Sequence, residues 1–345
     1  SFEKVQLRKF DTALAAKLYD RLLSRVLKNV PQRAPLTIIP DGVLALLPFE
    51  ALVTGGTATW KSGEWGPYPT GLTYVGDRNP IVYYRSLTAM TLTRARAKKA
   101  PKGDRMLVVA DPVFSMLDAR AQDNGAFSKV AAAGGKHSIN LMAAIEEETG
   151  GLFKLPRLKD TRELAVHLRE LYGADSDVYT GLKSCKAVFL STIAPQLTRY
   201  SSMVFATHGF AGNSIPGIME PALALTMVPP GTDGFLTMSE VAGLKMNPEI
   251  AALTACKTGV GVRLAGEGIM SMGRAFQSAG AKSITMSLWS VSEKASVMLM
   301  EAFFKRLKAG KTKLDAWTGA RQELRQAGLE HPFFWAAFIL VGERE

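Results

Sequence analysis

The sequence predicts an α/β protein in which helices cover both faces of a mostly parallel sheet. Two observations point to this class: short apolar runs typical of buried parallel strands recur after residue 104, and amphipathic helical patterns separate them. The chain has 345 residues, of which 47% are hydrophobic and 21% charged, so it can bury a sizeable core. This composition excludes a disordered chain and a small disulfide-stapled scaffold.

The beginning of the chain has three recognisable patterns. Apolar residues recur at helical spacing from Val5 to Val30, which predicts an amphipathic helix. Asp41-Gly42 lies between the apolar runs 36–40 and 43–47, a sequence signal for a tight β-hairpin. A long irregular loop is expected from Thr54 to Pro69.

A basic segment from Arg94 to Arg105, which also contains Pro and Gly, predicts an exposed linker. A processing site or a nucleic-acid contact is the alternative interpretation of these cations. We place a boundary at the linker, so that residues 1–103 form a first domain and residues 104–345 a second.

The second domain alternates strands and helices. The expected strands are Met106–Ala110, Ser202–Ala206, Ile250–Thr254, Ser283–Leu288 and Phe333–Val341. The expected helices are Asp160–Tyr172, Gly268–Ala279, Glu293–Leu307 and Leu314–Ala327. In such sheets the functional residues lie at the carboxyl ends of the strands.

Two predicted strands end on chemically reactive residues. His208 and Gly209 follow one strand, and Cys256 follows another. If these strands are neighbours, the imidazole faces the thiol and lowers its pKa by forming a thiolate–imidazolium pair. The backbone N–H groups of Gly209 and Cys256 are the candidate oxyanion donors. Taken singly, a buried cysteine or histidine is more often a core residue, and it is their combination that favours a catalytic site.

Several segments resemble the CHAT-domain family, whose members are similar to caspases and separases. These are LLPFEAL (Leu46–Leu52), FATHG (Phe205–Gly209), LTACKTG (Leu253–Gly259), GEGIMSMGRAF (Gly266–Phe276), AGAKSITMSLWSV (Ala279–Val291) and HPFFWAAFILVG (His331–Gly342). The 48 positions between His208 and Cys256 (256 − 208) are close to the roughly 50 of caspases, although Thr254 and Lys257 depart from the local caspase signature.

This resemblance implies a caspase-like three-layer α/β/α sandwich, preceded by a smaller α+β CHAT subdomain. It also implies a cysteine endopeptidase with His208 as general base and Cys256 as nucleophile, which cleaves a protein substrate without a cofactor. Family members often act beside a regulatory or sensor domain, in bacterial defence or cell-death systems. The first residue is Ser1, so such a domain is expected outside this chain.

The same resemblance places the substrate peptide along the edge after the Ser283–Leu288 strand, where Trp289, Ser290 and Val291 would line the cleft. Glu293 or Asp111 would give the first pocket a preference for Lys or Arg. The alternatives are that Glu293 only opens a helix and that Asp111 only shapes a turn.

Other functional classes find less support. The net charge of +11 keeps a nucleic-acid-binding module open, but the basic segment lacks interleaved aromatics. The four histidines form no zinc motif, so no metal is expected. Two cysteines indicate a reducing, cytoplasmic location, and we interpret Cys185 as structural. No apolar run reaches the length of a membrane span. A catalytically silent scaffold that binds a partner remains the alternative to the peptidase.

Overall fold

The structure is a computed structural model, and it describes residues 7–97, 103–122, 155–215, 217–228, 233–254, 265–290 and 292–345. The chain folds into two compact units. Unit 1 combines Ser1–Leu92 with Lys294–Glu345, and unit 2 is Thr93–Glu293. These units differ from the domains predicted from the sequence, because Lys294–Glu345 groups with the amino-terminal segment.

Unit 2 contains parallel strands in the order β12-β11-β7-β5-β6. The strands are β5 (Arg105–Pro112), β6 (Ser176–Gly181), β7 (Tyr200–Ala206), β11 (Ile250–Leu253) and β12 (Ser283–Ser287). Four of them coincide with predicted apolar runs, and β6 is an addition. Every residue of β11 and β12 is buried, as expected of strands covered on both faces.

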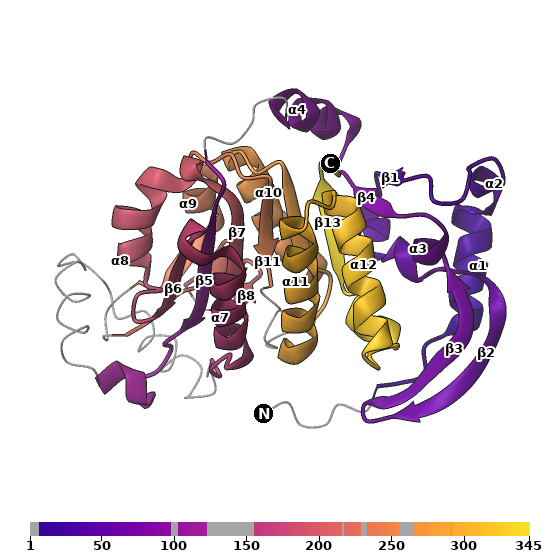
Figure 1. Cartoon of the computed structure of the whole chain (residues 1–345), viewed down its shortest axis with the longest axis horizontal. Helices are drawn as coiled ribbons and strands as arrows, with labels where there is room; N and C mark the ends of the chain where they lie inside the picture. Colours follow the sequence, from indigo (N-terminus) through magenta and orange to yellow (C-terminus); the bar gives the residue numbers. More distant parts are fainter. Residues whose placement is uncertain are drawn as a thin grey trace. The chain divides into compact units, whose positions relative to one another are not determined.

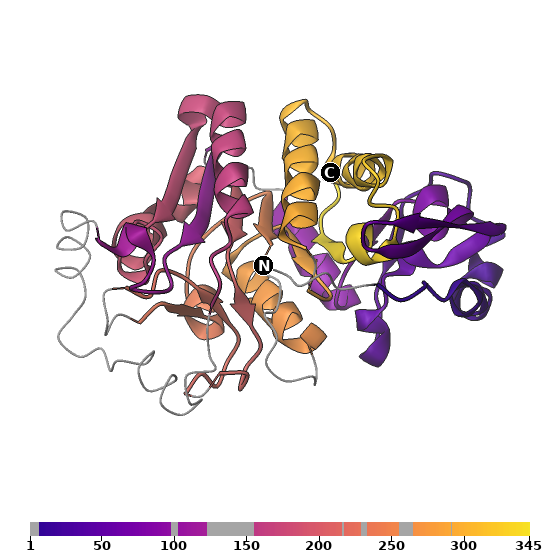
Figure 2. The same ribbon diagram turned by 90° about the horizontal axis from the view of Figure 1, so that it is seen from below.

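Helices connect these strands. They are α7 (Asp160–Tyr172), α8 (Lys186–Val188), α9 (Met238–Ala242) and α10 (Ala265–Ala279). Helix α7 lies on one face of the sheet and α10 on the other (Figures 1 and 2). The predicted α/β class with a mostly parallel sheet is therefore confirmed. A small antiparallel sheet of β8 (Gly209–Phe210), β9 (Ala222–Ala224) and β10 (Phe235–Thr237) follows β7.

Unit 1 contains three parallel strands in the order β1-β4-β13 together with a long hairpin. Its strands are β1 (Leu36–Ile38), β2 (Val53–Gly63), β3 (Gly66–Tyr74), β4 (Ile81–Tyr83) and β13 (Phe338–Gly342). Its helices are α1 (Thr12–Leu22), α2 (Ser24–Leu27), α3 (Val75–Arg78), α12 (Lys313–Gln326) and α13 (Pro332–Trp335). The division between the units falls within α4 (Leu87–Ala97) and at the first residue of α11 (Glu293–Lys308).

Two expectations for the amino-terminal part were wrong. No hairpin forms at Asp41-Gly42, because β1 pairs in parallel with β4 and residues Gly42–Leu46 form a 3-10 helix. The expected loop at Thr54–Pro69 is instead most of the β2–β3 hairpin seen in Figure 1. The pairing is irregular near Gly55 and Gly56, where the register shifts.

Three other boundaries need correction. The helix expected from Val5 to Val30 begins at Thr12, after an Asp11 cap, and is interrupted at Leu23. The expected linker is partly helical, because α4 runs to Ala97, and residues 98–102 lie outside the described residues. The final strand begins only at Phe338, because His331 caps the short helix α13 by accepting the Phe333 N–H at 3.0 Å.

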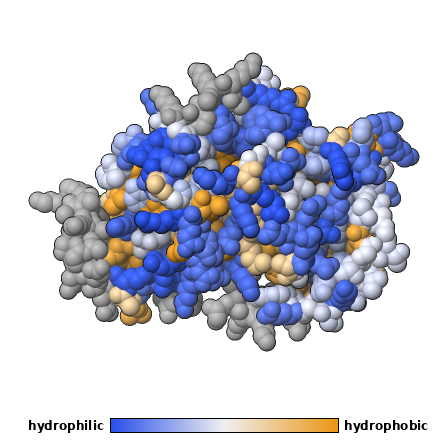
Figure 3. All heavy atoms as spheres, viewed as in Figure 1, coloured by the Kyte–Doolittle hydropathy of each residue, from blue (hydrophilic) through white to orange (hydrophobic). Residues whose placement is uncertain are grey.

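The surface in Figure 3 is mainly hydrophilic, with apolar side chains in small separate areas. Such scattered apolar exposure is normal for a folded protein and marks no interface by itself.

Candidate active site

The strands that precede His208 and Cys256 are neighbours. β7 and β11 pair in parallel, with Leu253 beside Phe205. The Thr254 N–H continues the contact by donating to the Phe205 carbonyl at 3.1 Å. Both strands therefore deliver their following residues to the same edge of the sheet. Cys256 itself lies outside the described residues, so its approach to His208 stays a prediction.

His208 is fixed in a buried position directly after β7. Its side chain is 1% exposed, and its ring centroid lies 5.1 Å from that of Phe114. The Nε2 atom lies 2.8 Å from the carbonyl oxygen of Pro156. Because a carbonyl oxygen can only accept, Nε2 carries the proton, and in the neutral ring Nδ1 is the basic nitrogen. Burial lowers the pKa of His208, and the Pro156 carbonyl partly opposes that shift.

Gly209 pairs with Leu223 of β9 in an antiparallel register. The Ala224 N–H donates to the His208 carbonyl at 2.8 Å. This bond makes Gly209 and Leu223 a non-hydrogen-bonded pair, whose N–H groups point away from the partner strand. The N–H of Gly209 is thus directed away from β9, as an oxyanion donor requires.

Asp111, the last residue but one of β5, has a left-handed backbone (φ 45°), and its side chain is fully buried. Arg157 binds the carboxylate with two parallel hydrogen bonds, both 2.8 Å long. Arg120 also pairs with it, Nη1 to Oδ2, at 2.7 Å. The carboxylate that was expected to reach the first pocket is therefore surrounded by two arginines of the chain itself.

Glu293 opens α11 and also lies at the amino end of α7. Its carboxylate accepts the Thr161 N–H at 3.2 Å, which satisfies one of the free donors of that helix. Burial raises the pKa of Glu293 to about 7, with a further contribution from the negative charge of Asp160, while the Thr161 bond acts in the opposite direction. The side chain is only partly buried.

The residues predicted to line the cleft follow β12. Trp289 and Ser290 are both partly buried, and Val291 lies outside the described residues. The structure places Trp289 and Ser290 beyond the carboxyl end of β12, the position expected for a peptide-binding edge.

The sequence patterns predict the helix from Asp160 but assign no role to residues 155–161, which precede and begin α7. Pro156 supplies the acceptor for His208, Arg157 holds Asp111, and Thr161 contacts Glu293. The contact between His208 and the Pro156 carbonyl joins residues 52 positions apart, and such a backbone contact cannot be predicted from a local sequence motif. Cys185 is buried, and burial raises its pKa, which agrees with its interpretation as a structural cysteine.

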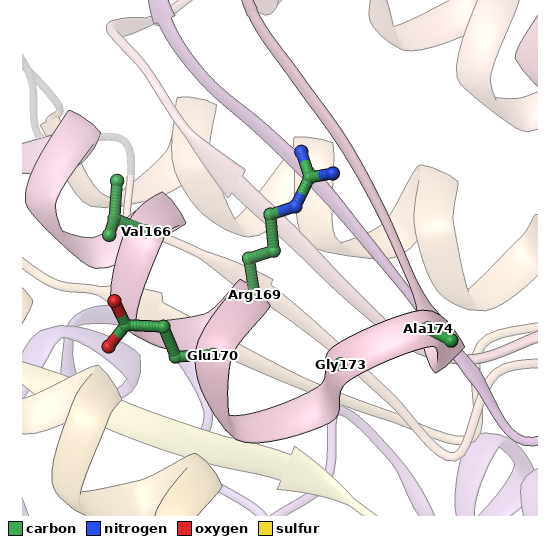
Figure 4. Close-up of a pocket in the computed structure, with 5 residues that line it drawn as sticks. All are labelled: Val166, Arg169, Glu170, Gly173 and Ala174. Carbon is green, nitrogen blue, oxygen red and sulfur yellow. The ribbon is translucent and has the colours of Figure 1, made fainter.

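A shallow pocket of about 440 Å³ lies at the other end of α7. Figure 4 shows its lining residues Val166, Arg169, Glu170, Gly173 and Ala174. At 1.5 Å per residue, most of the helix separates this pocket from Thr161, so it belongs to a different place on unit 2. Among the described residues, no three His, Cys, Asp or Glu side chains are grouped to hold a metal. Within the same part of the chain, every helix is too short or too polar to cross a bilayer.

Comparison with known protein families gives a match over most of the chain. The sequence model of the CHAT domain matches residues 12–343. Tetratricopeptide repeat protein 28 of Mus musculus and that of Homo sapiens are each 31% identical over 116 residues. That similarity covers 33% of this chain and only 5% of each relative.

Solved structures with a similar chain path include the Saccharomyces cerevisiae separase–securin complex. It has a TM-score of 0.46 and 12% identity, over 89% of this chain and 16% of that one. The Arg-specific cysteine proteinase gingipain R has a TM-score of 0.45 and 10% identity, over 77% of this chain and 55% of that one.

Proposed function

Because the chain belongs to the CHAT-domain family, we propose that it is a cysteine endopeptidase with His208 as general base and Cys256 as nucleophile. The observation that carries this proposal is the register of β7 and β11. His208 follows Phe205 and Cys256 follows Leu253 by the same three positions (208 − 205 and 256 − 253), and Phe205 and Leu253 are paired. Because the two strands run in the same direction and each residue lies three positions beyond the same pair, we expect the His208 and Cys256 side chains to lie close together.

The chemistry follows from the tautomer of His208. Nε2–H is engaged by Pro156, so Nδ1 accepts the thiol proton of Cys256. The thiolate sulfur attacks the peptide carbonyl, and the N–H groups of Gly209 and Cys256 bind the oxyanion. The imidazolium then returns its proton to the leaving amine. Water hydrolyses the thioester, which restores the thiol, and no cofactor takes part.

Glu293 is the better of the two candidates for recognition of a basic side chain next to the cleaved bond. The charge of Asp111 is already balanced by Arg157 and Arg120. At Glu293, by contrast, burial and the neighbouring Asp160 favour the neutral acid, so an incoming Lys or Arg would relieve an unfavourable charge. Trp289, Ser290 and Val291 would line the cleft beside it.

We also propose that a sensor domain or partner outside this chain regulates the activity, in a cytoplasmic and bacterial defence or cell-death setting. The repeat proteins whose short segment is similar to this chain support a larger molecular context.

The decisive experiment is digestion of a diverse peptide library, with the cuts identified by mass spectrometry. The chain has two cysteines, so Cys185→Ala is a matched control for Cys256→Ala. We expect cuts after Lys and Arg from the wild type and from Cys185→Ala, and none from Cys256→Ala or His208→Gln. Alkylation by iodoacetamide should be fast at Cys256 and slow at the buried Cys185.

Two results would overturn the proposal. Cuts that persist in Cys256→Ala would show that another residue or a contaminant cleaves the peptides. An absence of cuts together with slow alkylation of Cys256 would leave a silent scaffold as the function.

A further inference from the structure

Residues 156–158 of unit 2, which include the hydrogen-bond acceptor of His208, contact the rest of the unit at several points. The Pro156 carbonyl contacts His208. The side chain of the neighbouring Arg157 donates from Nε to one carboxylate oxygen of Asp111 and from Nη2 to the other. The carbonyl of the next residue, Leu158, accepts a hydrogen bond from the Thr161 hydroxyl at 2.7 Å. Leu155 packs against the buried cluster that contains Phe114, but Pro156 and Arg157 are exposed, so polar contacts hold these two residues in place.

Asp111 is an unusually well-fixed anchor for this segment. Its side chain is fully buried, and its backbone N–H donates to Thr161 Oγ1 at 3.1 Å. Arg120 holds the same residue twice, through the carboxylate at 2.7 Å and through the backbone carbonyl at 2.9 Å. Because these contacts fix the carboxylate, the position of Asp111 determines where the Arg157 guanidinium lies, and not the reverse.

The direction of the Pro156 carbonyl depends on this anchor. The pyrrolidine ring fixes φ of Pro156 near −65°, so one dihedral angle, ψ, remains to aim its carbonyl. The plane of that carbonyl is the peptide plane shared with Arg157. A bidentate guanidinium–carboxylate pair is planar and directional, and fixing the Arg157 side chain therefore restricts the remaining angle.

We infer that Arg157 and Asp111 are positioning residues of the His208–Cys256 dyad, whose ion pair aims the Pro156 carbonyl at His208 and thereby holds the Nε2–H tautomer. This inference rests on the proposed peptidase function for its catalytic consequence, but not for its structural content. Without the ion pair, the Pro156 carbonyl leaves Nε2, and a buried N–H donor loses its acceptor. The proton is then free to move to Nδ1, the atom that must accept the thiol proton.

The structural part can be tested without activity. In a Cys256→Ala background, which removes titration of the nucleophile, long-range ¹H–¹⁵N NMR reports the tautomer and pKa of His208, one of four histidines. We expect a single Nε2–H tautomer in this protein. In Arg157→Gln we expect a mixture of tautomers and a lower pKa, because the Pro156 contact that raises it is lost.

Arg120→Gln is the matched control. It removes the other arginine from the same carboxylate, but Asp111 stays buried and keeps both hydrogen bonds from Arg157 and its N–H bond to Thr161. We expect it to keep the single tautomer. Arg157→Lys keeps the positive charge without the planar fork, and we expect it to resemble Arg157→Gln. Equal thermal unfolding curves for the variants would exclude misfolding as the cause, and Arg157→Lys covers the case in which Arg157→Gln fails to fold.

With Cys256 restored, Arg157→Gln should lower kcat by about tenfold or more, the scale expected for a misplaced catalytic group, and change KM by less than about twofold. An unchanged tautomer and pKa in Arg157→Gln would overturn the inference, and so would equal effects of Arg120→Gln and Arg157→Gln. If the NMR result holds and no variant or wild type cleaves peptides, the proposed function fails while the positioning role stands.

Discussion

We expect Glu293 to make the stability of this protein depend on pH near neutrality. Its carboxyl group is partly buried at the amino end of α7, and burial raises its pKa from 4.5 to about 7. Between these values the folded protein holds a proton that the unfolded chain has released. The folded state therefore binds more protons than the unfolded state, and stability is lost as the pH rises through this window.

The magnitude follows from the shift. A pKa raised from 4.5 to about 7 corresponds to roughly 3 kcal/mol, since one pKa unit is worth about 1.4 kcal/mol. Because the side chain is partly exposed, solvent screening reduces this value, and we expect about 1 kcal/mol to be realised between pH 5 and pH 8. Glu293→Gln removes the titration but keeps an oxygen that can accept the Thr161 N–H. The variant should therefore gain about 1 kcal/mol over the wild type as the pH rises from 5 to 8.

Urea unfolding of both proteins at pH 5, 6.5 and 8 measures this difference. His208 and His331 have pKa values lowered by burial, so their protonation destabilises the fold as the pH falls below about 6.5. Both histidines are present in wild type and variant, and their contributions cancel in the comparison. Glu163→Gln on α7 controls for the removal of one negative charge. A gap between Glu293→Gln and the wild type that stays constant with pH would refute the reasoning.

Two further predictions concern stability. Glu50→Gln should lower the free energy of unfolding by about 3 kcal/mol. In the wild type the Glu50 carboxylate lies 2.9 Å from the buried Arg321 guanidinium and accepts a 2.6 Å hydrogen bond from the Tyr83 hydroxyl, so the variant leaves Arg321 without a charged partner and weakens the bond from Tyr83. A loss below about 1 kcal/mol in urea unfolding would contradict this prediction. Gly280→Ala should cost more than about 1 kcal/mol in the same assay, because Gly280 has φ of 126° and an added Cβ would clash with the Met246 carbonyl oxygen. An alanine variant as stable as the wild type would show that this turn can rearrange.

The apolar runs predicted most of the unit 2 sheet because its central strands are buried on both faces. Strands β7 and β11 were recognisable for this reason, and with them the place of His208. Strand β6 lies at the edge of the described sheet, and its first five residues are only partly buried, so it lacks a continuous apolar run. In unit 1 the pairing of β1 with β4 joins distant segments, which short-range turn signals cannot report.

The candidate site was predictable where side-chain chemistry follows a strand, and not where the backbone acts. His208 and Gly209 combine a reactive side chain with a flexible residue at a strand end, a local pattern. Pro156 acts through its carbonyl oxygen, an atom that every residue possesses. The sequence pattern shows Asp111 as a charged residue at a strand end, but its partner Arg157 is 46 residues away in the sequence. The ion pair of Asp111 is therefore formed by the tertiary fold and has no local sequence signal.

Thr161 contacts both Glu293 and Asp111, the two acidic residues that the sequence analysis proposes for the first substrate pocket. Its N–H donates to Glu293, and its hydroxyl accepts from the Asp111 N–H while donating to the Leu158 carbonyl. The amino end of α7 is thus a junction between the carboxyl end of β5 and the beginning of α11. The segment whose Pro156 carbonyl contacts His208 leads directly into this junction. In the proposed peptidase, substrate specificity at Glu293 and orientation of the base would therefore not be independent: a substitution that shifts Thr161 is expected to move the Glu293 carboxylate and the Pro156 carbonyl together.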